Sequence, residues 1–107
     1  MIYKEYGKTK KLVSAIGFGG MRFEKENGRY NIDKCVELLA EANKLGINYF
    51  DTAPGYNDDQ GEYIFGEAFK NMTKEFYVST KSIAKSGLEL RKDLERSLRR
   101  MNVDKIN

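Results

Sequence analysis

Short hydrophobic runs and amphipathic stretches alternate along the chain. Residues 3–6 and 11–15 are β-prone runs on either side of the polar stretch 7–10, and this arrangement predicts a hairpin. Residues 13–19 continue as a strand of small residues that ends in glycines. The amino-terminal part is therefore expected to be a hairpin that leads directly into a strand.

Three further segments have the composition of strands, and two have that of loops. Residues 47–50 are apolar and end at an aspartate, residues 76–80 are rich in β-branched and aromatic side chains, and residues 103–106 begin another strand. Polar residues at 21–31 include an Asn-Gly turn signal, and residues 52–61 contain the one proline of the chain. We expect both of these segments to be irregular.

Three segments between the strands carry apolar residues at helical spacing. The first is capped by Asn31 or Asp33, each able to accept a hydrogen bond from a free N–H group, and it ends at Gly46. The third begins with Ser86 and Glu89 in the spacing of a capping box, in which each side chain satisfies the other's backbone N–H. The apolar faces consist of Cys35, Leu38, Leu39, Ala42 and Leu45 in the first helix, Phe65, Ala68, Phe69 and Met72 in the second, and Leu90, Leu94, Ser97, Leu98 and Met101 in the third.

This order of elements predicts the α/β class. Alternating β and α elements with short connections imply parallel strands covered by helices, and both a doubly wound sheet and a (β/α)8 TIM barrel fit. A barrel typically needs ~250 residues, so 107 residues carry only about three of its eight units. We therefore expect residues 1–107 to form a single, incomplete domain.

Composition narrows the range of functions. Hydrophobic residues make up 40% and charged residues 33%, as in globular proteins, and the net charge of +3 does not suggest a nucleic-acid partner. The chain has no histidine, and its one cysteine, Cys35, is expected to be buried rather than reactive. Arg99 and Arg100 interleave with acidic residues and are expected on a solvated helix face. With no secretory signal and no membrane span, we expect a cytoplasmic protein without a metal site.

Residues 17–22 form a glycine-rich motif, G-F-G-G-M-R. A dinucleotide fingerprint would need a third glycine at Arg22 and a helix directly after it, and both are missing. A tight strand end is therefore the better interpretation. Small residues at such an end also leave the backbone open to a flat ligand.

Asp51, Tyr56 and Lys81 form a second candidate site. Asp51 ends one predicted strand, Lys81 follows another, and Tyr56 lies in the loop after Asp51, so all three belong to the carboxyl edge of the sheet. A nearby ammonium stabilises a phenolate and lowers the pKa of a tyrosine, which then serves as a general acid or base. From spacing alone, a strand-end turn with a surface tyrosine and a surface lysine is the slightly better interpretation.

A resemblance to a known family favours the catalytic interpretation. The block G-I-N-Y-F-D-T-A-P-G-Y at 46–56 and the following V-S-T-K at 78–81 resemble the aldo-keto reductase family. The same resemblance extends in order over Gly19-Gly20-Met21-Arg22, Glu62, Gly66-Glu67-Ala68 and Leu94-Glu95-Arg96-Ser97-Leu98, and over the opening hairpin.

The resemblance implies a (β/α)8 barrel that reduces aldehydes and ketones with a nicotinamide cofactor, usually NADPH, although NADH remains open. Tyr56 matches the family's proton donor, Lys81 the lysine that assists it, and Asp51 the carboxylate that pairs with this lysine. The fourth catalytic residue of the family is a histidine after the next strand, beyond Asn107. Activity is therefore expected to need further barrel units.

The resemblance also implies where the cofactor binds. Gly20, Met21 and Arg22 match the loop after the first strand that lies against the cofactor, together with Asp51. The partners implied are this cofactor and a small carbonyl substrate. A second hypothesis is a truncated, non-catalytic α/β module that self-associates or binds a partner through open barrel edges.

Overall fold

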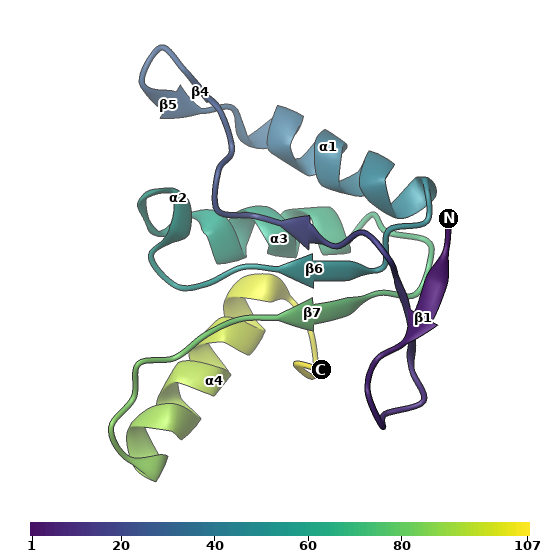
Figure 1. Cartoon of the computed structure of the whole chain (residues 1–107). Coiled ribbons are helices and arrows are strands. Elements are labelled where there is room, and N and C mark those ends of the chain that lie inside the picture. Colours follow the sequence, from purple (N-terminus) through teal and green to yellow (C-terminus); the bar gives the residue numbers. More distant parts are fainter.

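The computed structural model describes residues 1–107, which form seven strands and four helices (Figure 1). In chain order the elements are β1 (Tyr3–Glu5), β2 (Leu12–Ser14), β3 (Phe18–Gly19), β4 (Lys25–Glu26), β5 (Arg29–Tyr30), α1 (Ile32–Lys44), β6 (Tyr49–Asp51), α2 (Tyr56–Asp59), α3 (Gly61–Phe69), β7 (Tyr77–Ser79) and α4 (Gly87–Met101). No helix has both the length and the apolar composition that crossing a membrane requires.

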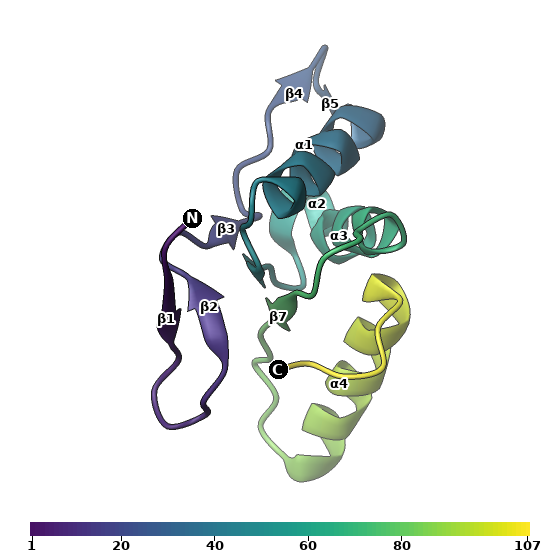
Figure 2. The same cartoon turned by 90° about the vertical axis from the view of Figure 1, so that its right-hand side faces the viewer.

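A parallel sheet of three strands lies at the centre of the molecule, as the alternation of elements predicts. Its order is β3-β6-β7, with Phe50 of β6 opposite Phe18 of β3 and Val78 of β7. Figure 2 shows α1, α3 and α4 together on one side of these strands and the β1–β2 hairpin on the other. Because the strands are parallel, their carboxyl ends, and the loops that follow them, meet at one edge of the sheet.

The opening hairpin is confirmed, but the strand predicted at 13–19 is not continuous. Tyr3 pairs with Ser14 across the antiparallel β1–β2 hairpin. The Ser14 hydroxyl then donates to the carbonyl of Ile16, and Ser14 and Asn48 exchange hydrogen bonds of 2.7 and 3.1 Å. These bonds turn the chain at the amino end of β6, so that only Phe18 and Gly19 join the sheet.

The helix ends follow the predicted caps with one difference. The Asn31 side chain accepts a hydrogen bond from Lys34 N at 3.1 Å, which makes Asn31 rather than Asp33 the cap of α1. Ser86 accepts from Glu89 N at 3.1 Å, as in a capping box. A capping box would have the Glu89 carboxylate accept from the N–H of Ser86, but it accepts from the N–H of Lys85 instead, at 2.8 Å.

An aromatic cluster between the sheet and α3 forms the core. Phe50, Phe65 and Phe69 meet edge to face at centroid distances of 5.7–6.3 Å, the arrangement that aromatic quadrupoles favour. The burial of Cys35 among these residues is confirmed, and burial raises the pKa of its thiol. Met72 lies beyond the end of α3 and packs on this core from there.

Four leucines predicted to face the core are exposed instead. Figure 2 shows α3 between α1 and α4, so each outer helix has one helical neighbour only. A helix with one neighbour buries a narrower stripe than the full apolar face that its sequence carries. The exposed leucines are Leu38 of α1, Leu45 directly after α1, and Leu90 and Leu94 of α4.

Two segments differ from the sequence-based expectation. The polar segment at 21–31 contains the short hairpin β4–β5, whose turn residues Asn27 and Gly28 have φ of 51° and 77°, as an Asn-Gly hairpin turn requires. The strand predicted at 103–106 is absent. Instead, Asn107 exchanges two 3.1 Å hydrogen bonds with the backbone of Val78, so the chain runs back to β7 without forming a ladder.

Candidate active site

The carboxyl ends of β6 and β7 place two charged side chains against each other. Asp51 lies opposite Ser79 in the parallel register, and Lys81 follows Ser79 by two residues. Lys81 Nζ donates to Asp51 Oδ2 at 2.8 Å and to the carbonyl of Thr52 at 2.9 Å. The Ser79 hydroxyl donates to the other carboxylate oxygen, so both oxygens of Asp51 are bonded.

Tyr56 completes the predicted trio. The Lys81 ammonium lies 5.0 Å from the centroid of the Tyr56 ring. Burial opposes the charge on this ammonium, but Asp51 and then Tyr56 outweigh it, and the pKa of Lys81 is raised. A lysine held in its charged form beside a phenol stabilises the phenolate, and this is the arrangement a tyrosine general acid needs. The structure thus brings together all three residues singled out from the sequence.

The loop that carries Tyr56 is an unusual left-handed turn that sequence analysis describes only as irregular. Asn57, Asp58 and Asp59 have φ of 55°, 56° and 62°, a region that Asn and Asp tolerate better than most residues. Consecutive left-handed residues turn the chain sharply between β6 and α3. The two ends of the loop therefore lie close together, with Tyr56 at the start of the turn.

Each of these three left-handed residues bonds a different part of the molecule. Asn57 Nδ2 donates to the carbonyl of Gly20 at 2.6 Å. Asp58 pairs with Lys25 of the β4–β5 hairpin at 2.8 Å. Asp59 pairs with a guanidinium of α4 at 3.0 Å. The loop is consequently fixed from three sides.

The glycine-rich end of β3 lies directly beside this loop. Gly20 N donates to the carbonyl of Asp51 at 2.8 Å, and a Cβ atom on Gly20 would lie 2.1 Å from a ring carbon of Phe65. A side chain at this position is therefore excluded by a buried ring. Gly19 has open space where a Cβ would be, and Met21 and Arg22 are exposed. The chain is thus exposed on both sides of Gly20, while Gly20 itself is buried.

Several residues support the trio although sequence reasoning assigned them no role; three of them, Ser79, Thr80 and Glu62, lie in the segments that carry the family resemblance. Ser79 bonds Asp51, Thr80 Oγ1 donates to the buried Glu62 at 2.7 Å, and Arg100 bonds Glu62 at 3.4 Å. The expectation that Arg100 lies on a solvated face is wrong, since its side chain is only 15% exposed. The alignment of two predicted strand ends could have indicated Ser79. No comparable signal marks Arg100, because its partners are 38 and 41 positions away.

Comparison with known proteins identifies what this geometry resembles. The sequence model described as "Aldo/keto reductase family" matches residues 15–107. An L-galactose dehydrogenase from Arabidopsis thaliana is 33% identical over 110 residues, which is 94% of this chain and 34% of that protein.

Solved structures of aldo-keto reductases have the same fold as this chain. The holo form of an aldo-keto reductase from Bacillus halodurans superposes with a TM-score of 0.84 and 28% identity, over 100% of this chain and 38% of that one. An aldo-keto reductase from Klebsiella pneumoniae in complex with NADPH superposes with a TM-score of 0.77 and 23% identity, over 91% of this chain and 34% of that one. The chain therefore spans about a third of the length of these proteins, and its three parallel β/α units are an incomplete part of a TIM barrel.

Proposed function

The chain belongs to the aldo/keto reductase family, and from this premise we propose that it supplies the proton-donating part of a reductase that uses NADPH or NADH to convert aldehydes or ketones to alcohols. The observation that carries the proposal is the placement of Tyr56 and Asp51 on either side of the Lys81 ammonium. This arrangement provides an acid, a charge that stabilises its conjugate base, and a group that fixes that charge.

Each member of the trio has one role in the proposed reaction. The Tyr56 hydroxyl protonates the oxygen of the carbonyl group as that carbon is reduced. Lys81 stabilises the phenolate left behind, and its bonds to Asp51 and to the carbonyl of Thr52 hold the ammonium in place. The proton then returns to Tyr56 from solvent, which is accessible because the Lys81 side chain is half exposed.

The residues after β3 and β6 fit part of a nicotinamide cofactor, which supplies the hydride when bound. Gly20 is held by its hydrogen bond to the carbonyl of Asp51 and lies beside Phe65, while Met21 and Arg22 are exposed. We propose that this backbone, with Asp51, lies against the nicotinamide end of the cofactor. We propose NADP(H), which the Klebsiella pneumoniae neighbour holds as NADPH, or NAD(H) as this cofactor.

A complete active site needs more of the barrel than residues 1–107 provide. The chain covers 34% of the Arabidopsis thaliana relative and 38% of the Bacillus halodurans structure. We therefore propose that residues 1–107 act as the amino-terminal segment of a barrel, and that they have no reductase activity on their own.

The test measures carbonyl-dependent oxidation of NADPH, and separately of NADH, by the polypeptide as its gene encodes it. A panel of aldehydes and ketones should include at least one that is reduced to its alcohol. Lys81→Met should lower this rate by the ~10²–10⁴-fold typical of general acid catalysis, whereas Lys85→Met, in the same loop, should not. Equal rates in both variants would contradict the assignment of Lys81, and no carbonyl-dependent oxidation would refute the proposed activity.

A second candidate function is association without catalysis, and the exposed edges favour it. β3 has one unpaired edge, the outer edge of β7 is covered only by Asn107, and Ile83, Leu88 and Leu90 are all more than half exposed. Unpaired strands and exposed apolar side chains promote pairing with another chain. Sedimentation of residues 1–107 would then show a dimer or larger species, and a stable monomer would exclude this candidate.

A further inference from the structure

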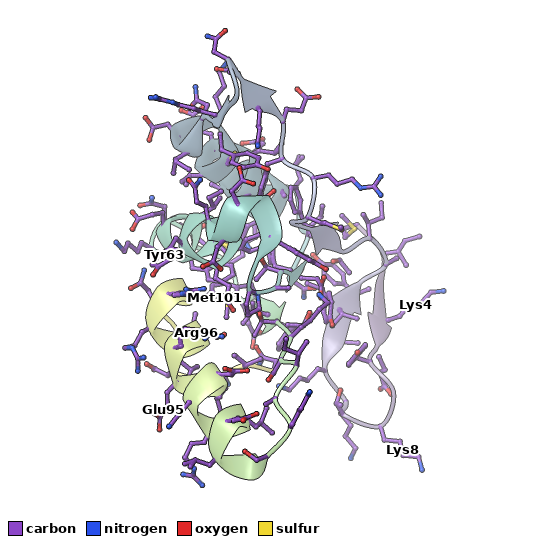
Figure 3. All side chains as sticks on the ribbon, turned by 90° about the vertical axis from the view of Figure 1, so that its left-hand side faces the viewer. Lys4, Lys8, Tyr63, Glu95, Arg96 and Met101 are labelled. Atoms are coloured by element: carbon purple, nitrogen blue, oxygen red, sulfur yellow. The ribbon has the colours of Figure 1, made fainter.

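Arg100, near the end of α4, lies between two acidic side chains of α2 and α3. Its two terminal nitrogens bond the two oxygens of Asp59 at 3.0 and 3.2 Å, a bidentate pair, and one of them also lies 3.4 Å from Glu62. The guanidinium further lies 5.0 Å from the ring centroid of Tyr63. Figure 3 shows Tyr63 and Met101 close together where α3 and α4 meet.

The backbone keeps this arginine close to its partners. A Cβ atom on Gly66 of α3 would lie 2.2 Å from the carbonyl oxygen of Arg100, so the two helices approach as closely as their backbones allow. Asn102 Nδ2 donates to the carbonyl of Gly66 at 3.3 Å and ties the end of α4 to the same turn of α3. The helix crossing thus fixes the backbone from which the guanidinium reaches its partners.

One arm of the network runs from Arg100 to the proposed proton donor. Asp59 Oδ1, which Arg100 bonds, also accepts from the backbone N–H of Gly55 at 3.0 Å. Gly55 directly precedes Tyr56, and its φ of 85° gives the chain a direction that few other residues would allow. Arg100 therefore fixes the backbone on the amino-terminal side of Tyr56 through Asp59.

The other arm runs to the proposed ammonium. Glu62 Oε1 accepts from the hydroxyl of Thr80 at 2.7 Å, and Thr80 directly precedes Lys81. The Glu62 side chain is fully buried, and Arg100 is the cation that lies against it. Removing the cation from a buried ion pair is strongly unfavourable, so Arg100 stabilises the carboxylate that accepts from Thr80.

We propose that Arg100 is a positioning residue that holds Tyr56 and Lys81 at their mutual distance by bonding the carboxylates that anchor both loops. The proposal rests on the proposed function, since it assigns Arg100 to the geometry of that same trio. A guanidinium suits this role because its planar fork presents several donors to two carboxylates at once, whereas an ammonium is a single point of charge. Asp59 and then Tyr63 outweigh the effect of burial and raise the pKa of Arg100, so the fork stays charged.

The test compares Arg100→Met with Arg99→Met, which removes a neighbouring arginine from the exposed face of the same helix. In the polypeptide as its gene encodes it, NMR of labelled tyrosine rings and lysine ε-methylenes reports the contact between Tyr56 and Lys81 directly. We expect Arg100→Met to weaken this contact and to lower kcat for carbonyl reduction with unchanged affinity for NADPH. Arg99→Met should change neither, and Arg100→Lys should restore the contact in part.

Arg100→Met alone could unfold the protein, so a second variant separates loss of the fold from loss of the positioning role. Arg100→Met leaves the buried Glu62 without its cation, so we pair it with Glu62→Gln, which keeps an acceptor for Thr80 and removes the carboxylate. A folded Arg100→Met/Glu62→Gln protein with an undiminished contact between Tyr56 and Lys81 would overturn the proposal. NMR measures the contact between Tyr56 and Lys81 without any enzymatic turnover. A wild-type protein that reduces no carbonyl would therefore refute the proposed function, but it would leave the role of Arg100 in holding the two loops untouched.

Discussion

The Lys81 ammonium lies 2.8 Å from Asp51 Oδ2 across the carboxyl edge of two neighbouring parallel strands. The two residues are 30 positions apart, and the register that sets Asp51 opposite Ser79 brings them together. The register holds the backbone at both strand ends rigidly in place. This rigidity is what a charge that assists proton transfer requires.

Replacing Asp51 tests the electrostatics of this pair. Asp51 raises the pKa of Lys81 against the opposing effect of burial, so Asp51→Asn should lower it. NMR titration of the labelled lysine Nζ measures the shift directly. Asp104→Asn, an exposed carboxylate elsewhere in the chain, is the control and should leave the titration of Lys81 as it is. A Lys81 pKa that is the same in Asp51→Asn and in the wild type would contradict the pairing.

The same pair predicts how stability depends on pH. Because the pKa of Lys81 is higher in the folded protein than its unfolded value of ~10.4, the pair stabilises the fold fully below that pH and loses its effect as the pH rises through the folded pKa. Both side chains are partly exposed, which limits the contribution to about 1 kcal/mol or less. Urea unfolding should therefore separate Asp51→Asn from the wild type at neutral pH and bring them together in strong alkali.

Gly20 and its neighbour Gly19 give a matched test of the strand end. A Cβ atom on Gly20 would lie 2.1 Å from Phe65, a fully buried ring of the core, whereas one on Gly19 would meet nothing within 4 Å. Gly20→Ala should lower the free energy of unfolding by about 1–3 kcal/mol, as overpacking does, and Gly19→Ala should leave it nearly unchanged. Equal unfolding midpoints in urea for the two variants would show that Gly20 does not lie against Phe65.

Asn57 tests the left-handed turn that follows Tyr56. Its φ of 55° costs a residue with a Cβ roughly 1–2 kcal/mol and costs glycine little. Asn57→Ala and Asn57→Gly both lose the hydrogen bond to the carbonyl of Gly20, so the difference between them isolates the backbone. We expect Asn57→Gly to be the more stable of the two by about 1 kcal/mol in thermal or urea unfolding. The reverse order would mean that this residue is not left-handed.

Local rules account for much of the fold. Apolar spacing and capping residues such as Asn31 and Ser86 predict the three main helices, and the short β-rich runs predict the sheet. They fail where the outcome depends on neighbours. Leu90 and Leu94 have the spacing of a buried face, but α4 has only α3 beside it, so both are exposed.

The site divides in the same way. Asp51, Tyr56 and Lys81 could be found because strand ends and loops are visible in the sequence, and the structure brings them together as expected. The network of Arg100, Asp59 and Glu62 that supports these residues could not be found from the sequence. The contact of Arg100 with Asp59 depends on how α4 crosses α3 beside the left-handed turn, and residue spacing carries no information on which positions meet there.

The most direct test of the central claim is the rate of carbonyl reduction by Tyr56→Phe, measured beside its affinity for NADPH in the polypeptide as its gene encodes it. Tyr77→Phe is the control, because Tyr77 is the first residue of β7 and Lys81 follows the other end of this strand. We predict that Tyr56→Phe loses turnover by ~10²–10⁴-fold while its affinity for NADPH is unchanged, and that Tyr77→Phe keeps both. Turnover by Tyr56→Phe at the rate of Tyr77→Phe would contradict the assignment of Tyr56 as the proton donor.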